Sequence, residues 1–97
     1  MEVEFIEQAL MELDDAIDYY NCQVPVLGQM FFDEVLQIID LITKFPEAWP
    51  ANTSHTRKSS LKKFPYSLIY SIENDVIYIL AVAHHHREPE YWIERSL

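Results

Sequence analysis

Glycine and cysteine are almost absent from this sequence of 97 residues, which contains one of each. A single glycine excludes the glycine-rich loops that cradle phosphates, and the lone Cys22 has no partner for an internal disulfide. No apolar run approaches the roughly 18 residues that a membrane-spanning helix needs. No lysine or arginine precedes Lys44, so the basic start of a secretory signal is also missing. We therefore expect a soluble, cytoplasmic protein with no membrane association.

The composition predicts one folded domain over residues 1–97. Hydrophobic residues make up 49% of the chain and aromatic residues 13%, a content that argues against disorder. A chain this short buries roughly 60 to 65% of its unfolded surface, which is enough for one core of two layers. Any functional site must lie on that single unit.

Positive charge is missing from the first 43 residues, which contain ten acidic side chains and no lysine or arginine. The remaining residues carry seven basic and six acidic side chains, and four of the basic ones lie within seven positions: Arg57, Lys58, Lys62 and Lys63. The net charge of −9 opposes approach to nucleic acid, but a dipolar molecule can still offer a local basic surface. An edge strand protected by lysines is the alternative.

A short strand and an amphipathic helix are predicted at the start of the chain. Residues 1–5 alternate apolar and acidic side chains, as a strand with one solvated face does. From Ile6 the period changes, and seven apolar residues fall within one arc of a helix: Ile6, Ala9, Leu10, Leu13, Ala16, Ile17 and Tyr20. Glu12 and other polar residues lie on the opposite side, which we interpret as a solvated face.

A second helix is predicted between Pro25, a good first-turn residue, and Pro46, which disfavours a helical Phe45. Its expected core stripe is Leu27, Phe31, Val35, Ile38, Ile42 and Phe45. A further apolar set, Phe32, Leu36 and Ile39, lies well around the helix from that stripe. Two explanations stay open: this set is buried against both the sheet and the first helix, or it forms an exposed groove for a partner.

Three strands are predicted after a loop over residues 47–56, in which Trp49 folds back onto the core. They span Thr56–Lys63, Tyr66–Ile72 and Val76–Ala83. Asn74 and Asp75 tolerate positive φ and suit a two-residue turn between the last two strands. The predicted fold class is α+β: a short N-terminal strand, a two-helix hairpin, then a three-stranded antiparallel sheet with the helices packed on one face.

That turn predicts that Tyr66 pairs with Ala83 and that Pro65 pairs with His84. His85 would then lie diagonal to Tyr66, while His84 and His86 face the other way. The surrounding basic groups are expected to be Arg57, Lys62, Lys63 and Arg87. A phenol, an imidazole and cations around one patch are the parts that phosphodiester cleavage requires, so Arg57, Tyr66, His85 and Arg87 are candidate catalytic residues.

Two other interpretations of the histidines stay open. They can simply end a strand, with one ring packed on Tyr91 or Trp92. His84 and His86 also share a strand face at a chelating spacing, although a convincing third metal ligand is missing. Cys22 has no partner for nucleophilic chemistry. We therefore expect no metal and no cofactor, and we expect Tyr91 and Trp92 to anchor the C-terminal tail on the sheet.

Once these residues are placed, the chain resembles the RelE and ParE toxins of type II toxin-antitoxin, or plasmid stabilisation, modules. The resemblance covers nearly the whole chain, and its most specific part is the Phe64-Pro65-Tyr66 run followed by a strand that ends in histidines and Arg87. It further rests on residues 12–20, Leu27-Gly28, residues 31–35, Phe45-Pro46-Glu47, Arg57, residues 67–70 and 79–83, and Pro89 with Tyr91-Trp92.

The resemblance implies two different activities. RelE-like members cut mRNA on the ribosome, and by position Arg57, His85 or His86, Arg87 and Tyr91 would be the counterparts of their catalytic side chains. ParE-like members lack such groups and poison DNA gyrase. Because ribosome-acting members are basic whereas this chain carries −9, we favour growth inhibition by binding a protein target such as gyrase. A ribosome-dependent endoribonuclease and an inactive homologue that only binds antitoxin stay open, so the resemblance does not decide whether the chain is an enzyme.

Under all three alternatives the resemblance implies a cognate antitoxin with a segment that is disordered alone and wraps the toxin. The set Phe32, Leu36 and Ile39 gives such a segment apolar surface to bury, and the acidic helices favour lysine and arginine on it. A homodimer through the same set is the competing use.

Overall fold

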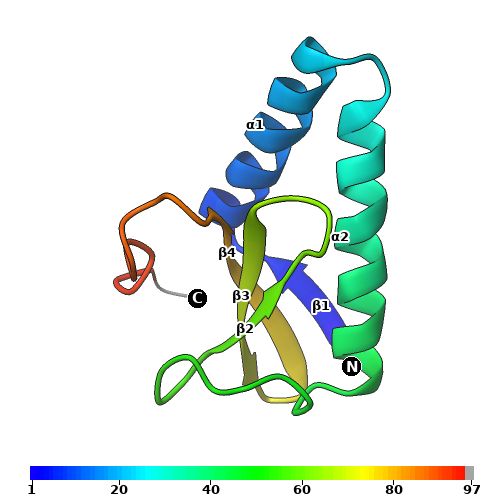
Figure 1. The fold of residues 1–97 in the computed structure, drawn as a ribbon. Helices are drawn as coiled ribbons and strands as arrows, with labels where there is room; N and C mark the ends of the chain where they lie inside the picture. The colour runs from blue at the N-terminus through cyan, green and yellow to red at the C-terminus, as the bar shows by residue number, and fades with distance from the viewer. Residues whose placement is uncertain (96–97) are drawn as a thin grey trace.

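Two helices and four strands make up residues 1–95, the part of the chain that the structure, a computed structural model, describes. In chain order they are β1 (Glu2–Phe5), α1 (Glu7–Gln23), α2 (Leu27–Lys44), β2 (Arg57–Ser60), β3 (Tyr66–Glu73) and β4 (Val76–His84) (Figure 1). The predicted α+β class is confirmed. The helices form an antiparallel hairpin whose turn projects beyond the sheet (Figure 1).

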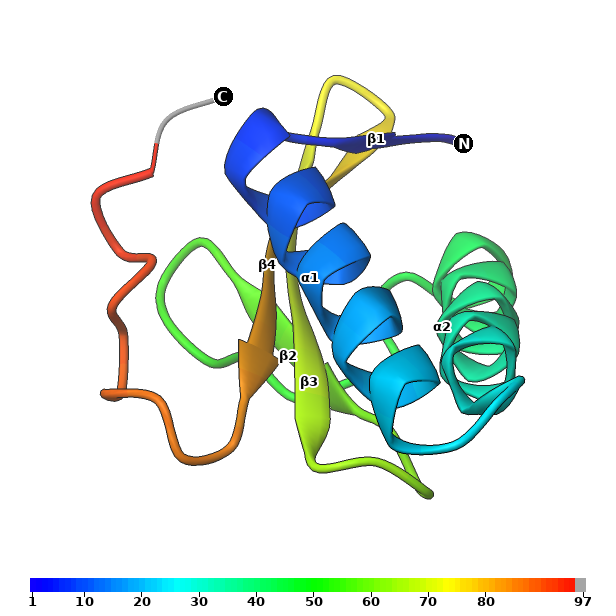
Figure 2. The same ribbon diagram turned by 90° about the horizontal axis from the view of Figure 1, so that it is seen from above.

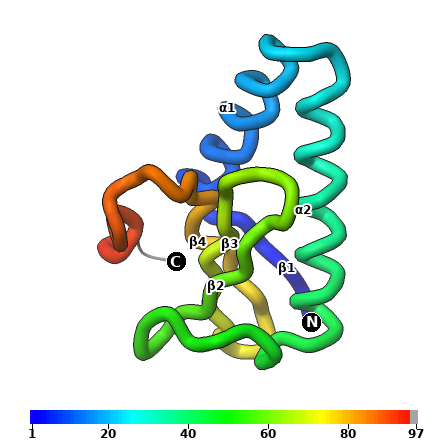
Figure 3. Tube along the Cα trace, viewed as in Figure 1, coloured from blue at the N-terminus to red at the C-terminus, as the bar shows by residue number. Residues whose placement is uncertain are grey.

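The sheet has four strands, in the order β1-β4-β3-β2, and not the three that we predicted. The short strand predicted at residues 1–5 is present as β1, but it is part of the sheet: it pairs with β4 in parallel, from Glu2 opposite Val76 to Phe5 opposite Ile79. The tube in Figure 3 shows the path of β1 from the N-terminus to the start of α1. Because β1 ends at Phe5, the edge of β4 beyond Ile79 has no neighbouring strand on this side within residues 1–95.

The turn between β3 and β4 is confirmed, and the predicted register is correct from Glu73 to Tyr70 but wrong by one residue from Ile69 to Tyr66. Asn74 and Asp75 both have positive φ, 51° and 63°, as a primed two-residue hairpin requires. Glu73 pairs with Val76 as expected, and the pairing then shifts between Ile69 and Tyr70. This β-bulge inserts one extra residue into β4, so Tyr66 pairs with His84 and not with Ala83.

The helices cover one face of the sheet, which we call the helix face. Seen from above, α1 lies across the sheet and α2 lies beside α1 (Figure 2). The only glycine of the chain, Gly28, lies where α2 approaches α1, and a Cβ there would come within 2.5 Å of the Ile17 carbonyl oxygen. The Gly28 N–H donates a 2.9 Å hydrogen bond to the side chain of Asn21. Close contact between the helices therefore requires glycine at this position.

The core between the layers contains most of the predicted stripe residues. Its buried side chains include Ala9, Leu13, Ala16, Phe31, Val35, Ile38, Ile42, Leu68, Tyr70, Ile77 and Ile79, and Trp49 packs against them as predicted. Phe45 was predicted in the core, but it lies after the last turn of α2 and is 60% exposed. Although α2 is strongly apolar, no helix within residues 1–95 is long and apolar enough to cross a membrane.

Candidate functional site

The histidines at the end of β4 lie on two different faces of the sheet. On the helix face, the His84 ring packs edge-on against the Tyr66 ring, with centroids 4.9 Å apart, and the His86 ring lies 5.0 Å from that of His84. The backbone N–H of His86 donates to Nδ1 of His84. Burial, and then the charges of His86 and His85, lower the pKa of His84, so that its ring is neutral at pH 7.

His85 lies on the opposite face, which we call the tail face because the tail, residues 87–95, covers part of it. Its N–H donates to the Pro65 carbonyl at 2.8 Å, and this bond extends the β3–β4 pairing by one step. Its Nε2 lies 3.0 Å from the hydroxyl of buried Ser67, which is itself 2.8 Å from the hydroxyl of Ser60. Three polar side chains from β2, β3 and the end of β4 are thereby linked.

A pocket of about 250 Å³ lies beside His85 on the tail face. Its charged lining residues are two basic and two acidic ones, Lys58, Arg87, Glu88 and Glu90. The Arg87 guanidinium lies over the ring of Tyr91, 3.9 Å from the centroid. The formal charges of these four lining residues cancel, which is unfavourable for holding a phosphate.

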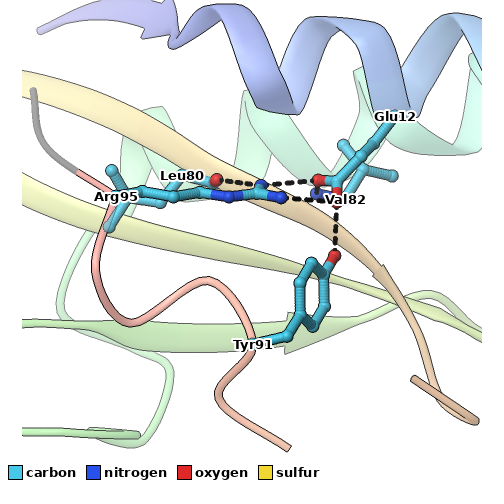
Figure 4. A network of polar contacts seen from close by, with 5 residues as sticks. All are labelled: Glu12, Leu80, Val82, Tyr91 and Arg95. Carbon is cyan, nitrogen blue, oxygen red and sulfur yellow. Dashed lines mark hydrogen bonds and ion pairs between the residues drawn. The ribbon is translucent and has the colours of Figure 1, made fainter. Parts of the chain in front are cut away.

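The tail is held against the free edge of β4 by Glu12, a residue that we predicted to be solvated (Figure 4). Its carboxylate accepts hydrogen bonds from the Arg95 guanidinium at 2.8 and 2.9 Å, from the Tyr91 hydroxyl at 2.5 Å and from the Val82 N–H at 3.0 Å. Arg95 also donates to the Leu80 carbonyl at 2.8 Å. Side chains thus satisfy the backbone groups of β4 that a strand beyond β1 would otherwise pair with.

This network sets the pKa values of its members. Burial opposes ionisation of Glu12, but the hydrogen bonds from Arg95, Tyr91 and Val82 together outweigh it and hold the pKa of the carboxyl below its ordinary value. Burial and then the bond to Glu12 raise the pKa of Tyr91 far above its ordinary value. The Tyr91 phenol therefore stays protonated at neutral pH and is a poor candidate for a general base.

Arg57 lies far from the histidines along the sheet. Arg57 pairs with Tyr70, whereas His84 pairs with Tyr66, and these two tyrosines lie near opposite ends of β3. Its guanidinium donates to the backbone carbonyls of Glu47 and Trp49, and so ties the loop after α2 to β2. Arg57 is thus engaged in a structural contact and does not face the pocket beside His85.

The predicted site residues therefore fall in three places. Tyr66 lies on the helix face with His84 and His86; His85, Arg87 and Tyr91 surround the pocket on the tail face; and Arg57 lies near the other end of the sheet. The bulge in β4 separates Tyr66 from His85, since it pairs Tyr66 with His84 in place of Ala83. Within residues 1–95, no group of three or more His, Cys, Asp or Glu side chains is placed to hold a metal ion.

The apolar set proposed for a partner is only partly free. Leu36 is 47% exposed, while Phe32 and Ile39 are half-buried and pack against the core. Tyr91 and Trp92 anchor the tail as predicted, because Trp92 is buried against Ile69 and Ala81 on the tail face. Sequence reasoning missed Glu12 and Arg95, which hold the tail in place.

Comparisons with known proteins agree with this architecture. Residues 3–89 match the family model described as the ParE toxin of the type II toxin-antitoxin system, parDE. A chain of the chromosomal ParDE TA system from P. aeruginosa superposes with a TM-score of 0.76 at 17% identity, over 87% of this chain and 95% of that one. The isolated E. coli RelE toxin superposes with a TM-score of 0.67 at 20% identity, over 93% and 89%. No curated protein has a significant sequence match.

Proposed function

Because the chain belongs to the ParE toxin family of type II toxin-antitoxin systems, we propose that it is the toxin of such a module and acts by binding a protein target such as DNA gyrase. Membership of the family implies a cognate antitoxin as partner. That it acts by binding, and not by cleaving RNA, is supported by the positions of the candidate catalytic side chains.

The observation that carries this proposal is the separation of those groups. RNA cleavage needs a base, an acid and cations around one phosphate. Here the guanidinium of Arg57 is bound to two backbone carbonyls, the Tyr91 phenol is bound to Glu12, and Tyr66 lies on the other face from His85. A protein that binds its target without chemistry does not need these side chains to converge.

Net charge supports the same conclusion. The chain carries −9, and its ten N-terminal acids lie on β1 and the two helices. Long-range repulsion lowers the rate at which such a molecule meets ribosomal RNA, most strongly at low salt. A folded protein partner can offer a basic surface that complements the helices.

A ribosome-dependent endoribonuclease is the second candidate, and the pocket beside His85 is the observation that favours it. An imidazole next to the Ser67 hydroxyl, with Lys58 and Arg87 in the same pocket, provides one group for proton transfer and two cations. Histidine can serve as acid or base near neutral pH. This activity would centre on His85, which lies beside Ser67, with His84 also in the pocket lining.

Two assays on the purified protein separate the candidates. We expect inhibition of gyrase supercoiling and no cleavage of mRNA in a translating extract. If translation stops with cut mRNA while gyrase is unaffected, the binding proposal is wrong. His85→Ala would then abolish cleavage, while His55→Ala, which changes a loop histidine, serves as the matched control. If neither target responds although antitoxin binds, the chain is an inactive homologue.

Two variants of α2, one within the proposed antitoxin surface and one outside it, test that surface. We propose that the set Phe32, Leu36 and Ile39 contacts the antitoxin, with Leu36 as its exposed member. Leu36→Asp should weaken antitoxin binding by about tenfold or more, because a charge replaces an apolar contact at the interface. Leu41 is similarly exposed, 43% against 47%, so Leu41→Asp is the control. Equal affinities of the two variants, measured by calorimetry, would refute this surface; sedimentation of the free toxin tests whether a homodimer uses it instead.

A further inference from the structure

A second pocket, of about 270 Å³, opens on the helix face between α1 and the end of β4. Ala16 and Val82 supply apolar lining, and three rings line it as well: Tyr19, Tyr66 and His84. The charged lining residues are Glu12, Asp15 and Arg87. Glu12 is already paired with Arg95. None of the activities discussed above uses this pocket.

The rings give the pocket flat apolar walls with polar edges. Tyr66 and His84 are held by their own edge-on contact, and Tyr66 is further fixed against Phe31, with centroids 5.1 Å apart. Tyr19 is 58% exposed and packs edge-on against Tyr20. Aromatic faces of this kind attract cations, and they stack well on a planar one.

Among the charges that line the pocket, Asp15 attracts a cation, whereas Arg87, whose guanidinium lies over the Tyr91 ring, opposes one. The carboxylate of Asp15 is exposed, and α1 carries no basic residue. Burial, and then the neighbours Tyr20, Tyr19 and Glu12, raise the pKa of Tyr66, so its phenol is neutral at pH 7 and adds no charge to the lining. His84 is neutral at pH 7 and offers a ring without competing charge.

The molecule already binds guanidinium groups in this way close by. Arg95 pairs with Glu12 while its guanidinium carbon lies 5.0 Å from the centroid of the Tyr91 ring, and Arg87 lies over the same ring. Both guanidinium groups lie against the Tyr91 ring, and that of Arg95 is also paired with the Glu12 carboxylate. The pocket on the helix face presents the same two elements, tyrosine rings and Asp15, while the guanidinium of Arg87, which also lines it, lies over the Tyr91 ring.

We propose that this pocket binds an arginine side chain of the antitoxin segment that neutralises the toxin. The rings of Tyr66 and His84 are nearly perpendicular, so the guanidinium stacks on one of them, meets the edge of the other and donates hydrogen bonds to the Asp15 carboxylate. Arginine fits better than lysine because its charge is planar and less strongly hydrated. The proposal rests on the proposed function only in that the arginine is assigned to the antitoxin.

Blocked arginine, N-acetyl-arginine methylamide, tests the pocket separately from toxin activity. We expect saturable shifts of the Asp15, Ala16 and His84 amide signals in NMR titrations of the labelled protein. Blocked lysine should bind more weakly, and blocked citrulline, which is planar but neutral, should produce no saturable shifts. No saturation with arginine, or equal binding of citrulline, would overturn the proposal while leaving the supercoiling result intact.

Two variants with opposite expected effects sharpen this test. Asp15→Asn should weaken arginine binding by about two- to fivefold, the range of an exposed ion pair. Asp33→Asn makes the same change of charge on α2, away from the pocket, and should leave the affinity unchanged. Arg87→Ala removes a like charge at the mouth and should strengthen binding. Equal effects of the two aspartate variants would mean that only net charge matters, and would refute the pocket.

Discussion

The two faces of the sheet are closed by different kinds of interaction. On the helix face, an apolar layer from α1 and α2 buries side chains such as Phe31 and Val35 completely. On the tail face, a small apolar cluster around Trp92 is supplemented by the polar network of Glu12, Tyr91 and Arg95. We infer that the helix face determines whether the chain folds, whereas the tail face determines how the His85 pocket is assembled.

The largest effect is expected from truncating the core of the helix face. Phe31 is fully buried, and its ring contacts those of Tyr20, Phe64 and Tyr66. Phe31→Ala should cost about 3–5 kcal/mol of the free energy of unfolding, through lost burial and a cavity. Hydrogen exchange should accelerate in every element. Acceleration confined to α2 would contradict a single cooperative core.

The next largest effect is expected from Glu12→Gln, which keeps the size of the side chain and removes its charge. The loss should be about 2 kcal/mol, because the ion pair with Arg95 is mostly buried and two further hydrogen bonds depend on the carboxylate. Exchange should accelerate at the Val82 amide and in the tail, while α2 stays protected. Asp14→Asn, an exposed change on the same helix, is the control. If both variants lose equal stability, the network does not hold the tail.

The sequence predicts the helix face well, because that face follows from periodicity. The apolar spacing of α1 and α2, the prolines at either end of α2 and the Asn74-Asp75 turn all lie within short windows of sequence. Each of these features restricts the backbone locally, so no tertiary contact is needed to predict it.

The tail face could not be predicted in the same way. The bulge falls within Ile79-Leu80-Ala81-Val82, where every residue is apolar, so no alternation marks the position at which the faces exchange. Glu12 looks solvated on a helical projection because its partner Arg95 is 83 residues away. A one-residue shift in register then places His84, and not His85, beside Tyr66.

A smaller effect of the same network is expected in the pH dependence of stability. The pKa of Glu12 is lower in the folded chain than the ordinary value of 4.5. The ionised carboxylate therefore stabilises the fold fully above pH 4.5, and this contribution is lost as the pH falls through the lower, folded pKa. The difference in unfolding free energy between the wild type and Glu12→Gln should shrink below pH 4.5. A difference that does not change with pH would contradict the ionic part of the network.

The smallest effect is expected from the hydroxyl that orients His85. Ser67→Ala removes the bonds to His85 and Ser60, but both partners are exposed and regain hydrogen bonds from water, so the cost should be below about 1 kcal/mol. The His85 ring should become more mobile, as carbon relaxation measures. Ser71 is the matched control, since it lies on the same face of β3 and its buried hydroxyl has no hydrogen-bond partner within residues 1–95. Ser71→Ala should be neutral or stabilising and should leave the His85 ring ordered. If both changes loosen that ring equally, Ser67 only fills space and the tail face does not orient His85 for chemistry.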